Sequence, residues 1–129
     1  MINMFGKKEV KAKELSVMHY EGIPYFATDY PCTLLFGDEE LIIRRQMPET
    51  TVVLPKNRIL SVSAMEEPRF MLRYHGNAAS TSNSPIINKY YLAIVYDKGL
   101  LAFWGTAKEY GEFLKIQNSI EAPAKYITL

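Results

Sequence analysis

The side chains that could bind a metal or act as a nucleophile are few and scattered along this sequence. The two histidines, His19 and His75, and the single cysteine, Cys32, lie far apart and match none of the Cys/His spacings of a zinc site. Cys32 lies in an apolar run with no histidine or basic residue near it, which favours a buried, unreactive thiol. We therefore expect no metal site, and a lone cysteine fits a reducing compartment.

Catalytic pairs are equally hard to assemble. Ser61, Ser63 and the serines within 80–84 have no base beside them in sequence, and the latter cluster reads as a polar loop. The carboxylates at 38–40 and 66–67 sit at expected turns, whereas general acid/base work requires burial that raises a pKa. No glycine-rich phosphate loop is present. We expect no enzyme activity and no cofactor.

Charge and composition narrow the class of protein further. Lys plus Arg number 15 and Asp plus Glu number 14, so the net charge of +1 argues against a nucleic-acid binder. The 48% hydrophobic and 22% charged residues are ordinary for a globular protein, and 129 residues suit one domain. The sequence shows neither a secretion signal nor an apolar run long enough for a membrane span, so we expect a cytoplasmic protein.

The chain divides into a domain and two flanking segments. Residues 1–14 hold four lysines and read as a basic, mobile lead-in, and residues 123–129 follow as a tail. Residues 15–122 form the expected domain, interrupted by a small polar stretch at about 76–86 that predicts a mobile loop.

Runs rich in Val, Ile, Thr, Tyr and Phe predict about seven strands within this domain. Turn residues separate them into hairpins, which is typical of an antiparallel barrel or sandwich. Residues 69–75 either extend the preceding strand or start another. The expected strands are 15–20, then the hairpins of 32–36 with 41–46, 50–54 with 58–65, and 89–97 with 100–104.

A helix follows the last strand. Thr106 and Glu109 have the spacing of a capping box, in which the threonine oxygen accepts from the backbone and the glutamate reaches back. Pro123 prevents the helix from continuing. A stripe at helical spacing predicts one docked face, formed by Tyr110, Phe113, Leu114, Gln117 and Ile120.

Three stretches carry a resemblance to a known family: CTLLFGDEELIIRR, TTVVLPKNRILSVSA and KYYLAIVYDKGLLAFWGTAKEYGEFLKIQ. Together they resemble the bacterial pleckstrin-homology-like (PH-like) and GRAM-type domains, over about residues 15–120. The resemblance implies a mainly β fold, a barrel of about seven antiparallel strands in consecutive hairpins, with one C-terminal helix covering one open end. It implies no catalytic residue.

Phosphoinositides are the best-known ligands of the eukaryotic PH domains, which bind them with basic residues around the first hairpin. Here Tyr20–Ile43 contains several carboxylates and neither Lys nor Arg, so this segment would repel an anionic headgroup. We therefore expect no phosphoinositide selectivity. Neighbouring residues of a strand face opposite sides, so only one of Arg44 and Arg45 can point inward. The candidate contacts with an anionic surface are Lys7, Lys8, Lys11, Lys13, Arg44 and Arg45, which predict weak membrane binding.

Both faces of the predicted strand 89–97 are apolar, and so are both faces of 100–104. Either the helix and the long loop cover the second face, or it stays exposed as a patch that forms an interface. On the latter interpretation the candidate interface residues are Tyr90, Tyr91, Tyr96, Phe103 and Trp104. The sequence thus predicts a non-catalytic interaction module that binds a protein partner or forms a homo-oligomer. The alternatives are a weak membrane-surface adaptor and a barrel with an internal small-ligand pocket.

Overall fold

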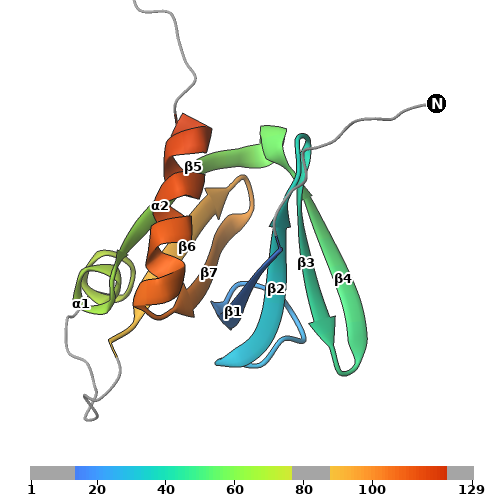
Figure 1. Ribbon diagram of the computed structural model, residues 1–129, viewed down its shortest axis with the longest axis horizontal. Coiled ribbons are helices and arrows are strands. Elements are labelled where there is room, and N and C mark those ends of the chain that lie inside the picture. The colour runs from blue at the N-terminus through green and yellow to red at the C-terminus, as the bar shows by residue number, and fades with distance from the viewer. Residues whose placement is uncertain (1–13, 77–87, 122–129) are drawn as a thin grey trace, which may run out of the picture.

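The structure, a computed structural model, describes residues 14–76 and 88–121. It contains one sheet of seven antiparallel strands, a C-terminal helix and a second, shorter helical segment (Figure 1). The predictions of a mainly β chain and of a C-terminal helix are confirmed. The elements are β1 (Glu14–Glu21), β2 (Tyr30–Phe36), β3 (Glu40–Gln46), β4 (Glu49–Pro55), the 3₁₀ turn η2 (Lys56–Arg58), β5 (Ile59–Glu66), α1 (Glu67–Phe70), the π-helical turn η3 (Met71–His75), β6 (Tyr90–Tyr96), β7 (Gly99–Gly105) and α2 (Ala107–Glu121).

The strands lie in the order β4-β3-β2-β1-β7-β6-β5. Two predicted hairpins are confirmed, β2 with β3 and β6 with β7. The predicted pairing of 50–54 with 58–65 is wrong, because β4 pairs with β3 and β5 pairs with β6. The 3₁₀ turn between β4 and β5 redirects the chain instead of reversing it, and the N–H of Lys56 bonds to the carbonyl of Glu39 beside β3. Among the described residues, β4 and β5 are thus the two unpaired edges of the sheet.

The sheet curls around one main core. Side chains alternate across each strand, and the inward set of all seven strands meets in this core. Phe113 of α2 and two residues of the β1–β2 loop complete it. Its buried members are Val17, Ile23, Phe26, Cys32, Leu34, Leu41, Ile43, Leu54, Val62, Leu92, Ile94, Leu101, Phe103 and Phe113.

Helix α2 begins with a variant of the predicted capping box. Oε1 of Glu109 accepts from the backbone N–H of Thr106 at 2.7 Å, as expected. The hydroxyl of Thr106, however, donates to the same carboxylate oxygen at 2.8 Å instead of accepting from the backbone. Burial raises the pKa of Glu109, but the hydrogen bonds from Thr106 outweigh it and hold this pKa below its usual value. The cap therefore depends chiefly on the glutamate.

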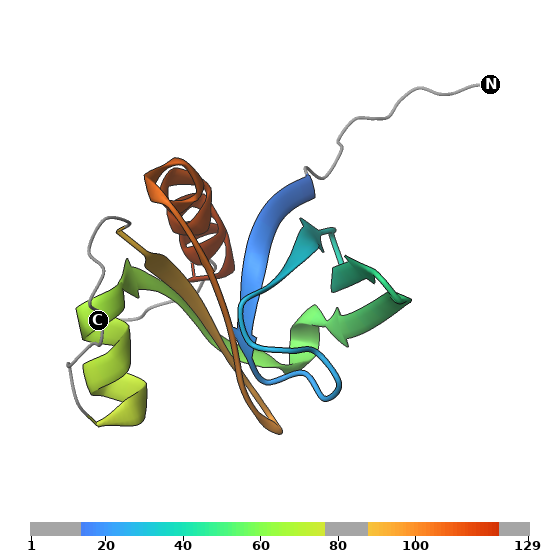
Figure 2. The same cartoon turned by 90° about the horizontal axis from the view of Figure 1, so that it is seen from below.

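A second, smaller core lies on the other face of β5, β6 and β7. The segment 69–75, expected as a strand, is helical in α1 and η3, and it ends at Gly76 with a φ of 82°. Phe70 of α1 is fully buried and stacks on Tyr91 of β6, with ring centroids 4.3 Å apart. Figure 2 shows α1 and α2 on opposite sides of these strands. This part of the sheet is therefore covered on both faces.

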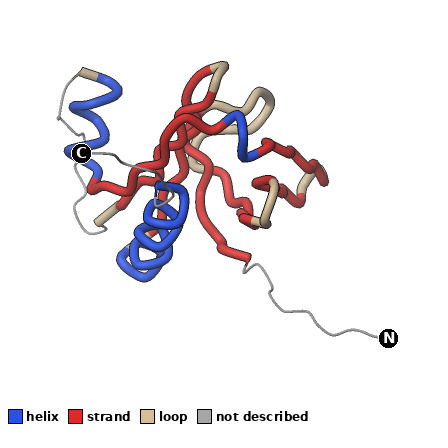
Figure 3. Tube along the Cα trace, turned by 90° about the horizontal axis from the view of Figure 1, so that it is seen from above, coloured by secondary structure: helices blue, strands red, loops and turns tan. Residues whose placement is uncertain are grey.

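Within the described part of the chain, the strands β3 and β4 have no such cover. In Figure 3 the longer helical segments lie beside β5–β7, and no helix lies beyond the β3–β4 hairpin. The predicted lead-in 1–14, loop 76–86 and tail 123–129 fall outside the described residues, except for Glu14 and Gly76. No helix in the described part of the chain is long and apolar enough to cross a membrane.

Candidate functional site

The predicted interface on the β6–β7 hairpin requires correction at its two central residues. Tyr91 and Phe103 are fully buried, Tyr91 in the smaller core and Phe103 in the main one. Tyr91 also donates a hydrogen bond of 3.2 Å to the carboxylate of Glu67, and burial raises its pKa above the usual value. Because α1 and η3 cover Tyr91 on the outer face of the hairpin and Phe103 faces the main core, these residues do not form an exposed aromatic patch.

The other three candidates are half-buried, and each has a partner within the chain. Tyr90 stacks on Tyr110 of α2 with centroids 4.4 Å apart. The guanidinium of Arg58 lies 5.5 Å from the ring centre of Tyr96 at the opposite end of the strand. Trp104 donates from its indole nitrogen to Asp29 at 2.7 Å. These contacts divide the predicted patch into separate pieces.

Of the predicted basic contacts, the four lysines lie outside the described residues. Arg44 points outward and forms a 3.4 Å ion pair with Glu14, in which both side chains are half-exposed. Such a pair contributes little to stability. Arg45 is buried, which corrects its assignment as a surface contact. The opposite orientations of the two arginines agree with the strand periodicity.

Arg45 instead holds two loops together. Its Nη1 donates to the backbone carbonyl of Tyr25 at 2.7 Å, and its Nε donates to that of Pro48 at 3.2 Å. Its Nη2 reaches the hydroxyl of Thr50 at 2.9 Å, and the guanidinium lies 4.3 Å from the ring centre of Phe26. Arg45 thereby joins the β1–β2 loop to the β3–β4 turn.

His19 holds the same β1–β2 loop from β1. It is buried, its Nδ1 lies 3.0 Å from the carbonyl of Ala27, and its Nε2 lies 3.2 Å from the backbone nitrogen of Ile23. The nitrogen of Ile23 can only donate, so Nε2 accepts and Nδ1–H donates, which makes the ring neutral. Burial lowers the pKa of His19 below its usual value and favours this neutral form.

The backbone of the loop is strained between these contacts. Tyr25 has a φ of 74° and Asp29 a φ of 63°, values in the left-handed region that residues with a side chain seldom adopt. Gly22, with a φ of 112°, passes so close to β7 that an added Cβ would meet the carbonyl oxygen of Leu100. Strain of this kind persists only where the surroundings impose it. Here His19 and Arg45 impose it from two different strands.

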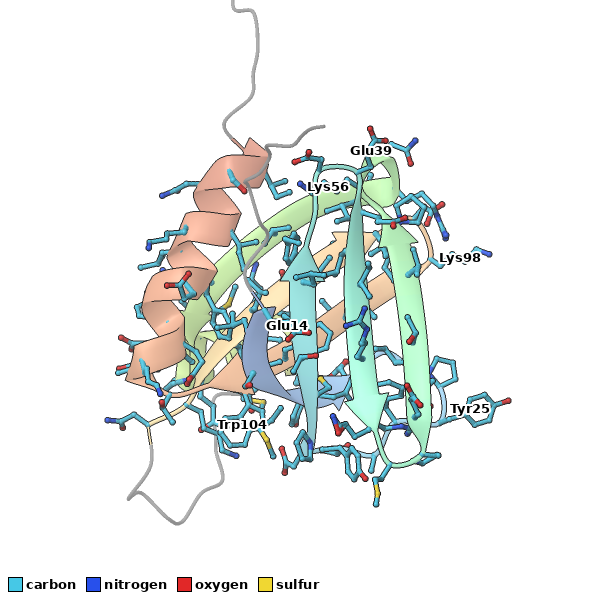
Figure 4. All side chains as sticks on the ribbon, turned by 45° about the vertical axis from the view of Figure 1, so that its right-hand side comes forward. Glu14, Tyr25, Glu39, Lys56, Lys98 and Trp104 are labelled. Carbon is cyan, nitrogen blue, oxygen red and sulfur yellow. The ribbon has the colours of Figure 1, made fainter. Side chains whose placement is uncertain are left out.

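The strained loop presents one aromatic ring to solvent. The side chain of Tyr25 is 93% exposed, and Met47 of the β3–β4 turn is 68% exposed. The hydroxyl of Tyr30 donates to the carbonyl of Met47 at 2.7 Å, which ties this turn to β2. Figure 4 shows Tyr25 projecting away from the body of the protein. We call Tyr25 and Met47, on the two loops that Arg45 joins, the loop tip.

A hollow of about 970 Å³ lies beside the loop tip, on the outer side of β1, β2 and β3. Glu14 and Trp104 both line it, and Figure 4 shows them on the same face of the protein. Met47 lines it too, so the hollow and the loop tip share that residue. Its lining mixes apolar and charged side chains without a dominant chemistry.

The described residues provide no evident catalytic group. Cys32 lines the hollow, but burial raises its pKa to about 12, so the thiolate is scarce at neutral pH. His19 is buried with both ring nitrogens engaged, and His75 pairs with Glu21 at 2.7 Å on the surface. Within residues 14–76 and 88–121, no three His, Cys, Asp or Glu residues are placed to hold a metal ion.

Sequence reasoning missed the loop tip and the residues that position it. The stretch 21–31 appeared only as an irregular loop, and its clamps come from positions distant in the chain. A tyrosine beside a proline in a short loop was the only local signal. Comparison with known proteins adds no identification, because neither a family model nor a curated protein matches the chain.

Proposed function

We propose that this chain is a non-catalytic interaction module of the PH-like class, and that it binds a protein partner through the loop tip. The class is supported by the meandering strand order and by the C-terminal helix, whose Phe113 enters the main core. The class does not decide the function, because one fold serves many functions. The function depends on the side chains that the surface exposes.

The observation that carries the proposal is an exposed tyrosine on a strained loop that two buried side chains hold in place. Tyrosine is enriched among the residues that dominate binding energy, and a loop fixed in advance loses little entropy when a partner binds. Two buried side chains, His19 and Arg45, hold this loop while Tyr25 remains almost fully exposed. Nothing in the described core requires an aromatic side chain at position 25.

The charges around the loop tip indicate what the partner offers. Glu21, Asp29 and Glu49 lie in or next to the two loops, and the guanidinium of Arg45 is engaged within them. This acidic surrounding disfavours an anionic membrane and favours a protein surface with basic side chains around an apolar pocket. The weak membrane adaptor therefore receives no support from the loop tip.

The test compares exposed apolar residues in two places. The full-length protein, Tyr25→Ser and Leu60→Ser are used as baits in extract from the source organism, and captured proteins are quantified. Leu60 on β5 is 69% exposed and serves as the matched control. We expect Tyr25→Ser to weaken capture of the partner by at least about 30-fold, the size of a hot-spot loss of about 2 kcal/mol.

Leu60→Ser should capture the partner as the wild type does. Circular dichroism and thermal unfolding establish that each variant is folded. Identical sets of captured proteins from all three baits would overturn the assignment to the loop tip.

A further inference from the structure

The two edge strands of the sheet differ in the hydrogen-bond partners of the backbone groups that face away from the sheet. Helix α2 packs along β5, and Oε1 of Gln117 accepts a hydrogen bond of 2.7 Å from the backbone N–H of Ala64. This N–H belongs to the edge of β5 that no strand occupies. The helix thus supplies an acceptor in the place of a further strand.

On β4, the register determines which backbone groups face outward. The N–H of Lys56 donates to the carbonyl of Glu39 at 2.9 Å. The residues of β4 that lie an even number of positions before Lys56 therefore direct their backbone N–H and C=O groups toward β3. The N–H and C=O groups of Thr51 and Val53 therefore point to the open side of the sheet. No described residue forms a hydrogen bond with these groups.

The middle of this edge lacks the usual protection against pairing. Edge strands commonly carry a lysine, a proline or a bulge that prevents another strand from adding. β4 begins at Glu49 and ends at Pro55, but residues 50–54 between them are Thr, Thr, Val, Val and Leu, without a charge or a proline. Val53 is 48% exposed, and on the outer face it continues a cross-strand apolar row with Ile42 and Leu35. Between Glu49 and Pro55 the edge is thus open, uncharged and rich in β-branched residues.

We infer that β4 pairs with β4 of a second copy of this chain, antiparallel about a twofold axis at Val52. The inference rests on the proposed interaction function, of which it is the self-assembling part, but it uses a surface separate from the loop tip. The twofold places Thr51 of one copy opposite Val53 of the other. Both residues direct their backbone groups outward, so each such pair exchanges two hydrogen bonds. The sheet then continues from one copy into the other.

The charges at the ends of β4 favour a second copy as the occupant. Glu49 lies at one end of the strand and Lys56 directly after the other end. Antiparallel pairing brings the acidic end of each copy beside the basic end of its mate, whereas parallel pairing would place like charges together. The edge is therefore complementary to itself, as a twofold interface requires.

The test measures the mass of the full chain in solution by sedimentation, from about 5 to 200 μM. We expect the wild type to reach twice the mass of one chain. Thr51→Pro removes an N–H that points outward and forms no hydrogen bond with β3, and an edge strand tolerates proline at such a position. This variant should stay monomeric at every concentration. Thr51→Val keeps that N–H and should dimerise as the wild type does.

A second pair of variants leaves the backbone donors intact. Val53→Lys places a charge on the β4 edge and should raise the dissociation constant of the dimer by at least about tenfold. Leu60→Lys makes the same change on an exposed residue of β5 and should leave the dimer unchanged. Circular dichroism shows which variants are folded, so Val53→Lys decides the question if Thr51→Pro fails to fold.

Two results would overturn the inference. One is a wild type that has the mass of one chain at every concentration, and the other is a dimer that Leu60→Lys weakens and Val53→Lys does not. Neither result bears on the loop tip, because partner capture by Tyr25→Ser is a separate measurement. Conversely, a dimer lost in Thr51→Pro supports β4 pairing even if Tyr25→Ser captures every partner.

Discussion

The sheet ends in two edge strands that the chain treats in opposite ways. Helix α2 covers β5 and satisfies its backbone at Ala64, whereas β4 leaves the backbone groups of Thr51 and Val53 without a partner among the described residues. An edge that is covered prevents the addition of another strand, and an edge that is bare permits it. The difference indicates that any strand-to-strand contact of this protein takes place on one side only.

The same asymmetry extends to the faces of the strands. In β3, buried positions alternate with half-buried or exposed ones, because only the inner face is covered. In β6, four consecutive residues are buried, because α2 and the main core lie on one face and α1 on the other. The continuous apolar run of β6 therefore marks a strand covered on both faces, not an exposed patch.

The largest effect is expected when the anchor of α2 is removed. Phe113 is fully buried in the main core, so Phe113→Ala should lower the free energy of unfolding by about 3–5 kcal/mol. Denaturant unfolding measures this loss. Lys115→Ala changes an exposed residue of the same helix and should stay within about 0.5 kcal/mol of the wild type. A loss below about 1 kcal/mol for Phe113→Ala would show that α2 does not protect β5 through this ring.

A smaller effect isolates the backbone contact at the covered edge. Gln117→Leu leaves the N–H of Ala64 without its acceptor and should destabilise the protein by about 1–2 kcal/mol. Hydrogen exchange should accelerate at Ala64, while Gln117→Glu retains an acceptor oxygen and should preserve the protection. Unchanged exchange at Ala64 in Gln117→Leu would remove the distinction between the two edges.

The smallest expected effect is a loss of stability at acidic pH, and it should begin in the half of the sheet that ends in β4. The pKa of His19 is lowered in the folded state by burial, so the unfolded chain binds a proton more readily than the folded one. The contribution of His19 is fully present above its ordinary pKa of 6.5 and is lost as the pH falls from there toward the folded pKa. The slope reaches at most about 1.4 kcal/mol per pH unit.

Urea unfolding at a series of pH values between about 7 and 5 measures this slope. Protonation forces Nε2 of His19 to give up the hydrogen bond from Ile23, so exchange should rise in the 22–29 loop before it rises in β5–β7. His19→Gln can make both contacts without titrating and should lose the slope. An equal slope in His19→Gln would assign the acid sensitivity to another group.

Local patterns in the sequence predict most of the elements but not the cover of β6. Strands and the C-terminal helix follow from residue types, turn residues and the Thr106–Glu109 spacing. The segment 67–75 is short and aromatic, which suits a strand or a helix equally. A glutamate followed by a proline at its start is a signal for a helix N-terminus, and it gives the better prediction.

The loop tip could not have been predicted from the sequence, because its geometry depends on contacts between distant positions. Arg45 reaches the carbonyl of Tyr25, and Trp104 reaches the carboxylate of Asp29 from the far end of the chain. A left-handed backbone at Tyr25 has no local cause in its residue type. It follows only from the fold that brings β1, β3 and β7 to one end of the protein.

The buried thiol of Cys32 makes this chain convenient for spectroscopic labelling. With a pKa of about 12 and little exposure, the only natural cysteine should react slowly with maleimides at neutral pH. A cysteine introduced at an exposed site would then be the one reactive thiol in the protein. Spin labels or fluorophores attached there can report distances between molecules without removal of the native residue.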